Sequence, residues 1–178
     1  MNHKVVKAYF DYVREERWLN VMSDKGYHLK NYRFMLYTFE KNEDIQYFYR
    51  IELLDHMPGH EKSQAYFSFL EETGVEVLTT YFRWVYLRKP LSHGAFDLFS
   101  DYESKIKHHR KILTLQVSIG LANLAIGFSN ISMSSERNTV SLAAGSLSLS
   151  VALLLLSLGL RSYFRIKKLE REKLISES

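Results

Sequence analysis

Two long stretches without a charged side chain constrain this sequence more than any other feature. Ile112 to Ile131 and Val140 to Leu160 contain no Asp, Glu, Lys or Arg. A helix of about 20 residues crosses a hydrocarbon core of about 30 Å. The alternative is a pair of buried helices in a soluble bundle, but a chain of 178 residues could hardly cover two such helices on all sides. The sequence therefore predicts two transmembrane helices.

The two predicted spans divide the chain into four parts. We expect a folded domain at 1–90, a linker and juxtamembrane helix at 91–111, a transmembrane helical hairpin at 112–161 and a basic tail at 162–178. The polar segment 134–139 between the spans is long enough only for a tight turn.

Basic residues flank both spans on the side away from that turn. Because positively charged flanks stay on the cytoplasmic side, we expect a multi-pass protein of the plasma membrane with both termini in the cytoplasm. The bilayer is then the first partner of the chain. The residues expected to contact lipid head groups are Lys105, Lys107, Arg110, Lys111, Arg161, Arg165, Lys167 and Lys168.

Polar and small residues follow one face of the first span, and small residues follow one face of the second. Such faces favour packing within the hairpin or self-association into a homo-oligomer, because small residues admit close approach and amides bond across the contact. A polar path or ligand site inside the membrane is the alternative. The residues concerned are Gln116, Gly120, Asn123, Gly127 and Asn130 in the first span, and Ala144, Ser148 and Ala152 in the second.

The first 90 residues predict a mixed α+β fold. Patterns of strand and helix alternate in the order βαββαβ, which indicates a ferredoxin-like antiparallel sandwich. The segment 41–44 suggests a hairpin between the second and third strands, and the last strand is either single and long or a pair bent near Phe82 and Arg83. The expected elements are 4–10, 13–25, 27–41, 44–53, 60–73 and 75–88.

An internal repeat supports this fold. Aligning Gly26 with Gly74 places Trp18 on Tyr66 and an apolar Met on an apolar Leu four residues later. Each half then reads as a strand, an amphipathic helix, a terminal glycine and another strand.

One face of the predicted sheet gathers aromatic and arginine side chains, which suits a binding platform. The alternative is that the C-terminal segment or the bilayer surface covers this face. Nucleic acid is not expected there, because residues 1–100 hold 13 lysines and arginines against 14 aspartates and glutamates. The candidate residues are Arg33, Met35, Tyr37, Phe48, Arg50, Phe82 and Trp84.

Signals of catalysis or of a cofactor are weak. The chain has no cysteine, and His56 and His60 flank a Pro-Gly pair that keeps them off one helical face. Glu15 and Glu16 are interpreted as part of a solvated helix face. We therefore expect no catalytic residue, no metal site and no cofactor, although an enzyme acting at the membrane surface stays an alternative.

Several segments together carry a family resemblance over residues 5 to 112. They are Glu16-Arg-Trp-Leu-Asn20, Tyr37-Thr-Phe-Glu-Lys41, Phe69-Leu-Glu-Glu-Thr-Gly74, Phe82-Arg-Trp-Val-Tyr86 and Phe96-Asp-Leu-Phe-Ser-Asp101. In this order they resemble a family of Gram-positive bacteria known only as a domain of unknown function, the 2812 family. Its members are often predicted membrane proteins. The resemblance implies no activity and no site residue.

The sequence thus predicts a membrane-anchored, non-enzymatic sensor or accessory protein whose cytoplasmic domain binds a partner protein or a small ligand. The motivation is a compact domain without catalytic motifs, joined to a membrane hairpin by the helix expected to begin near residue 100. The alternative is a structural subunit of a membrane transport complex, motivated by the polar face of the first span.

Overall fold

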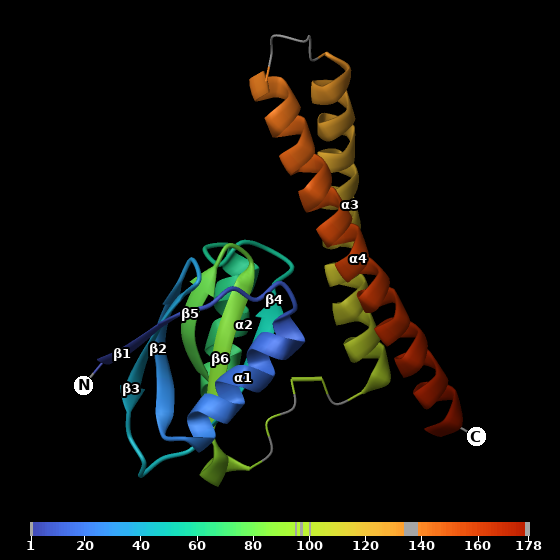
Figure 1. Cartoon of the computed structure of the whole chain (residues 1–178). Helices are drawn as coiled ribbons and strands as arrows, with labels where there is room; N and C mark the ends of the chain where they lie inside the picture. Colours follow the sequence, from blue (N-terminus) through green and yellow to red (C-terminus); the bar gives the residue numbers. More distant parts are fainter. Residues whose placement is uncertain (1, 95, 97, 100, 134–138, 177–178) are drawn as a thin grey trace. The chain divides into compact units, whose positions relative to one another are not determined.

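The computed structural model describes residues 2–94, 96, 98–99, 101–133 and 139–176. They belong to two compact units, Met1–Leu98 and Phe99–Ser178. Figure 1 shows a mixed α+β arrangement in the first unit and two long helices in the second, as the sequence predicted in outline.

The first unit consists of two successive βαββ repeats. The first repeat comprises β1 (Asn2–Val6), α1 (Tyr12–Asp24), β2 (Tyr27–Arg33) and β3 (Leu36–Lys41). The second comprises β4 (Tyr47–Leu53), α2 (Glu61–Glu72), β5 (Glu76–Tyr81) and β6 (Trp84–Pro90), followed by the short 3-10 helix η1 (Leu91–His93).

Each repeat forms its own antiparallel sheet with its last strand in the middle, in the orders β1-β3-β2 and β4-β6-β5. The repeats share even an irregularity. The pairing shifts by one residue between Leu29 and Asn31 in β2, and between Val77 and Thr79 at the equivalent place in β5. The repeat expected from the sequence is therefore present and is longer than expected, because it includes a third strand in each half.

The predicted ferredoxin-like sandwich is wrong in its strand number and sheet order. The segment predicted as one strand at 27–41 folds back at Phe34 and Met35, whose φ angles are 40° and 64°. Such turns usually carry Asn or Gly, so residue type gave no signal here. The segment 75–88 is the bent strand pair that was one of the two expectations, with Phe82 at φ 52°. No hairpin joins β3 to β4, because they lie in different sheets.

Two hydrophobic clusters hold the first unit together. One joins α1 to both sheets and contains Leu19, Leu29, Tyr37, Phe39, Tyr49, Ile51 and Tyr86. The other packs under α2 on the opposite face of the second sheet and contains Leu54, Leu70, Val75, Val85, Leu87 and Phe96. Alternate residues of β4 and β6 serve the two clusters, as expected for a sheet that is covered on both faces.

Helix α1 satisfies the outer edge of β4 with polar side chains. Asn20 accepts a hydrogen bond from the Tyr49 N–H at 2.8 Å and donates one to the Tyr49 carbonyl at 3.1 Å. The Ser23 hydroxyl makes the same pair of bonds with Tyr47: it donates to the Tyr47 carbonyl and accepts from the Tyr47 N–H. Glu16 accepts from the Ile51 N–H at 3.0 Å. These contacts replace a neighbouring strand and fix α1 across the second repeat.

The second unit is an antiparallel hairpin of α3 (Tyr102–Ser132) and α4 (Thr139–Ser176), which run side by side in Figure 1. Asp101 caps α3 by accepting from the Ser104 N–H at 2.8 Å. Most of the predicted turn, residues 134–138, lies outside the described residues. The segment expected as a tail continues α4 as far as Ser176.

Both long helices are long and apolar enough to cross a membrane. In their most apolar 18-residue windows only 17% and 11% of the residues are buried. Leu121, Phe128, Leu147 and Leu153 are each more than half exposed. The core helix of a soluble protein would hide such side chains, so this pattern favours the membrane interpretation.

Candidate functional site

The predicted aromatic and arginine face does not exist as one surface. Tyr37 is fully buried, and Trp84 packs against the same cluster, because these positions face α1. Arg50 lies over the Phe48 ring at 4.3 Å from its centroid and pairs with Glu16 at 3.1 Å. The structure therefore corrects the predicted site.

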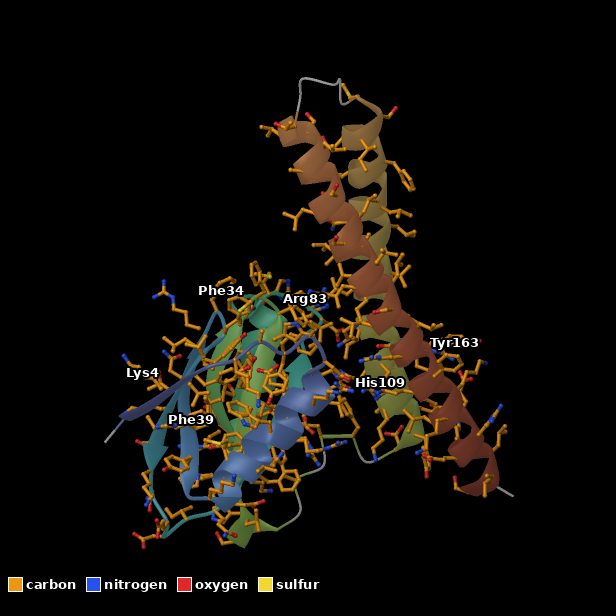
Figure 2. The ribbon with its side chains drawn as sticks, in the orientation of Figure 1. Lys4, Phe34, Phe39, Arg83, His109 and Tyr163 are labelled. Carbon is orange, nitrogen blue, oxygen red and sulfur yellow. The ribbon has the colours of Figure 1, made fainter. Side chains whose placement is uncertain are left out.

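The other predicted residues of that face belong to hairpin turns. Arg33 ends β2, Met35 lies in the turn that follows, and Phe82 lies in the turn between β5 and β6. Phe34, beside Met35, is 67% exposed and Phe82 is 69% exposed. In Figure 2, Phe34 lies at the tip of the first hairpin while Phe39 lies farther along the sheet.

One buried carboxylate of the first unit is bonded to both of its sheets. Glu15 lies on α1 and is only 6% exposed. The hydroxyl groups of Tyr37 on β3 and Tyr86 on β6 both donate to its Oε1 atom, each at 2.6 Å. One carboxylate thus receives a short hydrogen bond from the middle strand of each sheet, and it links the two repeats.

Burial sets the protonation of this group. It raises the pKa of Glu15 above the ordinary 4.5, and the two phenol hydrogen bonds counteract part of that rise. Burial also raises the pKa values of Tyr37 and Tyr86 far above 10, with the neighbouring Glu15 adding to the effect. Both phenols therefore stay protonated and act as hydrogen-bond donors at physiological pH.

Aromatic rings surround the carboxylate and its two phenols. The Trp18 ring, one helical turn after Glu15, makes an edge contact with Tyr37 at 4.9 Å between centroids. Tyr9 lies 5.4 Å from Trp18, and the Tyr32 ring lies 4.8 Å from Tyr86. We call Glu15, Tyr37, Tyr86, Trp18 and Tyr9 the aromatic carboxylate centre.

A cation of the chain itself already lies on this centre. The Lys7 Nζ atom lies 4.7 Å from the Trp18 ring centroid and 4.9 Å from that of Tyr9. The Lys7 backbone N–H donates to the Met35 carbonyl at 2.8 Å, which anchors the residue beside the rings. The two rings therefore have the geometry of a cation–π site.

The sequence pattern predicted a solvated helix face for Glu15 and Glu16, so this centre was not expected. Glu15 is buried, and Glu16 bonds β4. A signal was present: Glu15 falls three and four residues before Trp18 and Leu19, on the face that becomes the core. The phenol partners could not be found in this way, because they come from distant strands.

His56 and His60, which the sequence did not predict to form a site, lie close together in space. The His56 and His60 rings stack at 4.2 Å between centroids, and His60 caps α2 by accepting from the Lys62 N–H at 3.2 Å. No group of three or more possible metal ligands occurs among the described residues.

The small and polar residues predicted to line the transmembrane hairpin lie mostly at the contact between α3 and α4. A Cβ atom added to Gly127 would lie 3.1 Å from the Gly145 carbonyl oxygen, so the two backbones nearly touch. Ala152 is fully buried, and the Ser162 hydroxyl donates to Gln116 Oε1 at 2.8 Å. Gly120 also lies in this contact, against Leu155 and Leu156 of α4.

The predicted face of the second span is displaced by one residue at its start. Ala144 is exposed, and its neighbour Gly145 makes the contact; Ser148 is half-buried. Asn123 donates to the Ile119 carbonyl of its own helix at 2.9 Å, and Asn130 lies beside Gly145. Both Ala and Gly are small, so residue size alone could not decide between the two registers.

Several basic residues expected at lipid head groups are held in ion pairs. Arg110 and Lys167 both reach Glu170, at 2.9 and 3.0 Å, and Lys168 lies 3.7 Å from Glu172. Exposed pairs of this kind add little stability. The remaining residues of the set, Lys105, Lys107, Lys111, Arg161 and Arg165, lie on the same portions of α3 and α4.

A comparison with known families identifies one match. The model described as "Protein of unknown function (DUF2812)" matches residues 11–121, which is more than half of the 178-residue chain. The match covers both helices and most strands of the first unit and continues into α3. No curated protein and no solved structure matches the chain significantly.

Proposed function

We propose that this chain, which belongs to the DUF2812 family, is a membrane-anchored, non-enzymatic sensor whose N-terminal unit binds a small ligand at the aromatic carboxylate centre. The hairpin of α3 and α4 anchors it in the plasma membrane as a two-span protein. Both termini, and with them the binding unit, lie in the cytoplasm.

The observation that carries this proposal is the burial of Glu15. A carboxylate removed from water destabilises the folded state unless its hydrogen bonds compensate for the lost hydration. An apolar side chain at the same core position would not have this desolvation cost. Buried ionisable groups that do not favour folding are concentrated at binding and catalytic sites. Tyr37 and Tyr86 hold Glu15 in one orientation, as a binding site requires.

A small ligand is favoured over a protein partner by the place of this centre. Glu15, Tyr37 and Tyr86 are all less than a tenth exposed, so a protein surface could not reach them without opening the fold. The adjoining Trp18 and Tyr9 rings are only half-buried and form the accessible side. A compact ligand can contact these rings from solvent and interact electrostatically with the carboxylate behind them.

The alternative, a structural subunit of a transport complex, has less support. It requires the polar face of α3 to be available to another protein. Gln116 is instead bonded to Ser162 of α4, and Asn123 to its own helix. These bonds favour a hairpin that satisfies its polar groups internally.

The membrane arrangement can be tested with single cysteines, because the natural chain has none. We expect Asn138→Cys, in the segment of sequence between α3 and α4, to react with a membrane-impermeant maleimide in intact cells. Lys4→Cys and Ser176→Cys should react only after permeabilisation. Labelling of the two terminal positions in intact cells would reverse the proposed orientation, and recovery of the chain in the soluble fraction without detergent would refute anchoring.

A further inference from the structure

The position of the Lys7 side chain indicates the class of ligand that the aromatic carboxylate centre binds. Its ammonium group lies within 5 Å of two ring centroids, those of Trp18 and Tyr9. Positive charge over ring faces is stabilised by their quadrupoles, most strongly over Trp. The position above these rings is therefore one that favours a cation.

We infer that the Tyr9–Trp18 pair is a binding site for an organic ammonium ion, which Lys7 occupies when no ligand is present. This inference rests on the proposed ligand-binding function and specifies its ligand. The incoming ammonium ion would replace the Lys7 ammonium over the rings. Its apolar substituents would cover ring surface that Lys7 leaves partly open.

The carboxylate behind the rings adds the charge that a cation site needs. Trp18 touches Tyr37 edge to face at 4.9 Å, and Tyr37 donates to Glu15 at 2.6 Å. Glu15 and Trp18 lie on one face of α1, three residues apart. A negative charge held inside the aromatic wall attracts a cation at its outer side more strongly than it would in water, because the intervening medium is less polar.

Lys7 is placed so that it can leave. Its backbone is fixed by the bond to the Met35 carbonyl, but its side chain is exposed, as are the neighbouring Ala8 and Phe10. Withdrawing a lysine side chain into solvent needs rotation about side-chain bonds only. An exposed cation–π contact is weak, so an incoming ammonium ion can displace the Lys7 ammonium from the rings.

The test is a titration of the full-length chain in dodecyl maltoside micelles with choline, followed by calorimetry against micelles without the protein. Binding should be saturable, and 3,3-dimethylbutan-1-ol, the uncharged analogue of choline in which a carbon atom replaces the quaternary nitrogen, should bind at least tenfold more weakly. Equal binding of the two probes would overturn the inference, but it would leave a ligand-binding function standing.

Variants with opposite expected effects separate displacement from structural damage. Lys7→Ala should tighten binding about two- to fivefold, because the competing ammonium is gone. Lys4→Ala removes an equal charge from β1, where Lys4 is exposed to solvent, and should leave affinity unchanged. Trp18→Leu should weaken binding at least fivefold. Weaker or unchanged binding by Lys7→Ala would contradict the displacement.

The outcome also distinguishes this inference from the proposed function. If the chain is inserted in membranes and Glu15→Gln stabilises it, but neither the natural chain nor Lys7→Ala binds the ammonium probe, the ligand class is wrong and the function survives. If the chain is not inserted in membranes, the proposed function itself fails.

Discussion

Gly26 and Gly74 have nearly the same left-handed backbone, with φ angles of 77° and 78°. Each follows the helix of its repeat and precedes the next strand, so the two residues mark equivalent turns. Their surroundings differ. A Cβ atom at residue 26 would lie 2.9 Å from the Cγ atom of Glu43 and 3.3 Å from the Asn42 carbonyl oxygen, whereas at residue 74 it would only approach His93 at 3.4 Å.

We therefore predict that Gly26→Ala is more damaging than Gly74→Ala. Both substitutions place an L side chain in the left-handed region, which costs about 1–2 kcal/mol. Gly26→Ala must also displace its neighbours, which adds about 1 kcal/mol or more. Thermal unfolding followed by tryptophan fluorescence measures both, because Trp18 and Trp84 are the two tryptophans of the chain. Equal losses would mean that the crowding at Gly26 relaxes freely.

The polar bond between α1 and β4 gives a second prediction. Asn20→Ala leaves the N–H and carbonyl groups of Tyr49 without their partner and should lower the free energy of unfolding by about 2 kcal/mol. Val21→Ala, at a partly exposed position on the same helix, is the control and should cost less than about 0.5 kcal/mol. A similar small loss for both would show that water replaces Asn20 at this edge.

The pH dependence of stability follows from the raised pKa of Glu15. Because its folded-state pKa lies above the unfolded value of about 4.5, this group favours folding at acid pH, and its contribution is lost as pH rises from 4.5 through the folded pKa. Tyr37, Tyr86 and Tyr32 face it and stay protonated throughout, so they do not change the sign.

The measurement is the difference in unfolding free energy between Glu15→Gln and the natural chain, because other carboxylates cancel in that difference. We expect the free energy of unfolding of Glu15→Gln to increase relative to that of the natural chain as pH rises from 4.5 to 8. A difference independent of pH would show that Glu15 does not change its ionisation on folding.

The hairpin contact can be tested by a disulfide. A Cβ atom added to Gly159 would lie 4.0 Å from the Gln116 Cβ, which is within the range of a disulfide. With a protease site placed in residues 134–138, Gln116→Cys with Gly159→Cys should keep the two fragments linked after oxidation and cleavage. Gln116→Cys with Leu160→Cys, whose second position is 57% exposed, should not. Linkage into dimers would instead indicate that α3 and α4 pair between copies.

The sequence was sufficient for features that depend on local pattern. Two long uncharged stretches predicted α3 and α4, and two helix-ending glycines predicted the repeat. The third strand of the first repeat was missed because Phe34 and Met35 form a tight turn with residues that rarely do so. The open sheet face was predicted from a four-stranded sandwich, and it disappeared when α1 proved to cover Tyr37 and Trp84.

The aromatic carboxylate centre was beyond reach for a different reason. Its hydrogen bonds join Glu15 to residues 22 and 71 positions away, and no local pattern records which distant tyrosines meet a given helix. The sheet order supplies that information, since it places β3 and β6 in the middle of their sheets.

Stability and binding measured together on Glu15→Gln test the account most directly. The amide oxygen can still accept from Tyr37 and Tyr86, while the buried charge is removed. At pH 8 we predict a gain of about 1 kcal/mol in the free energy of unfolding and at least a tenfold loss of affinity for choline. A variant that unfolds several degrees earlier and binds as well as the natural chain would show that Glu15 only supports the fold.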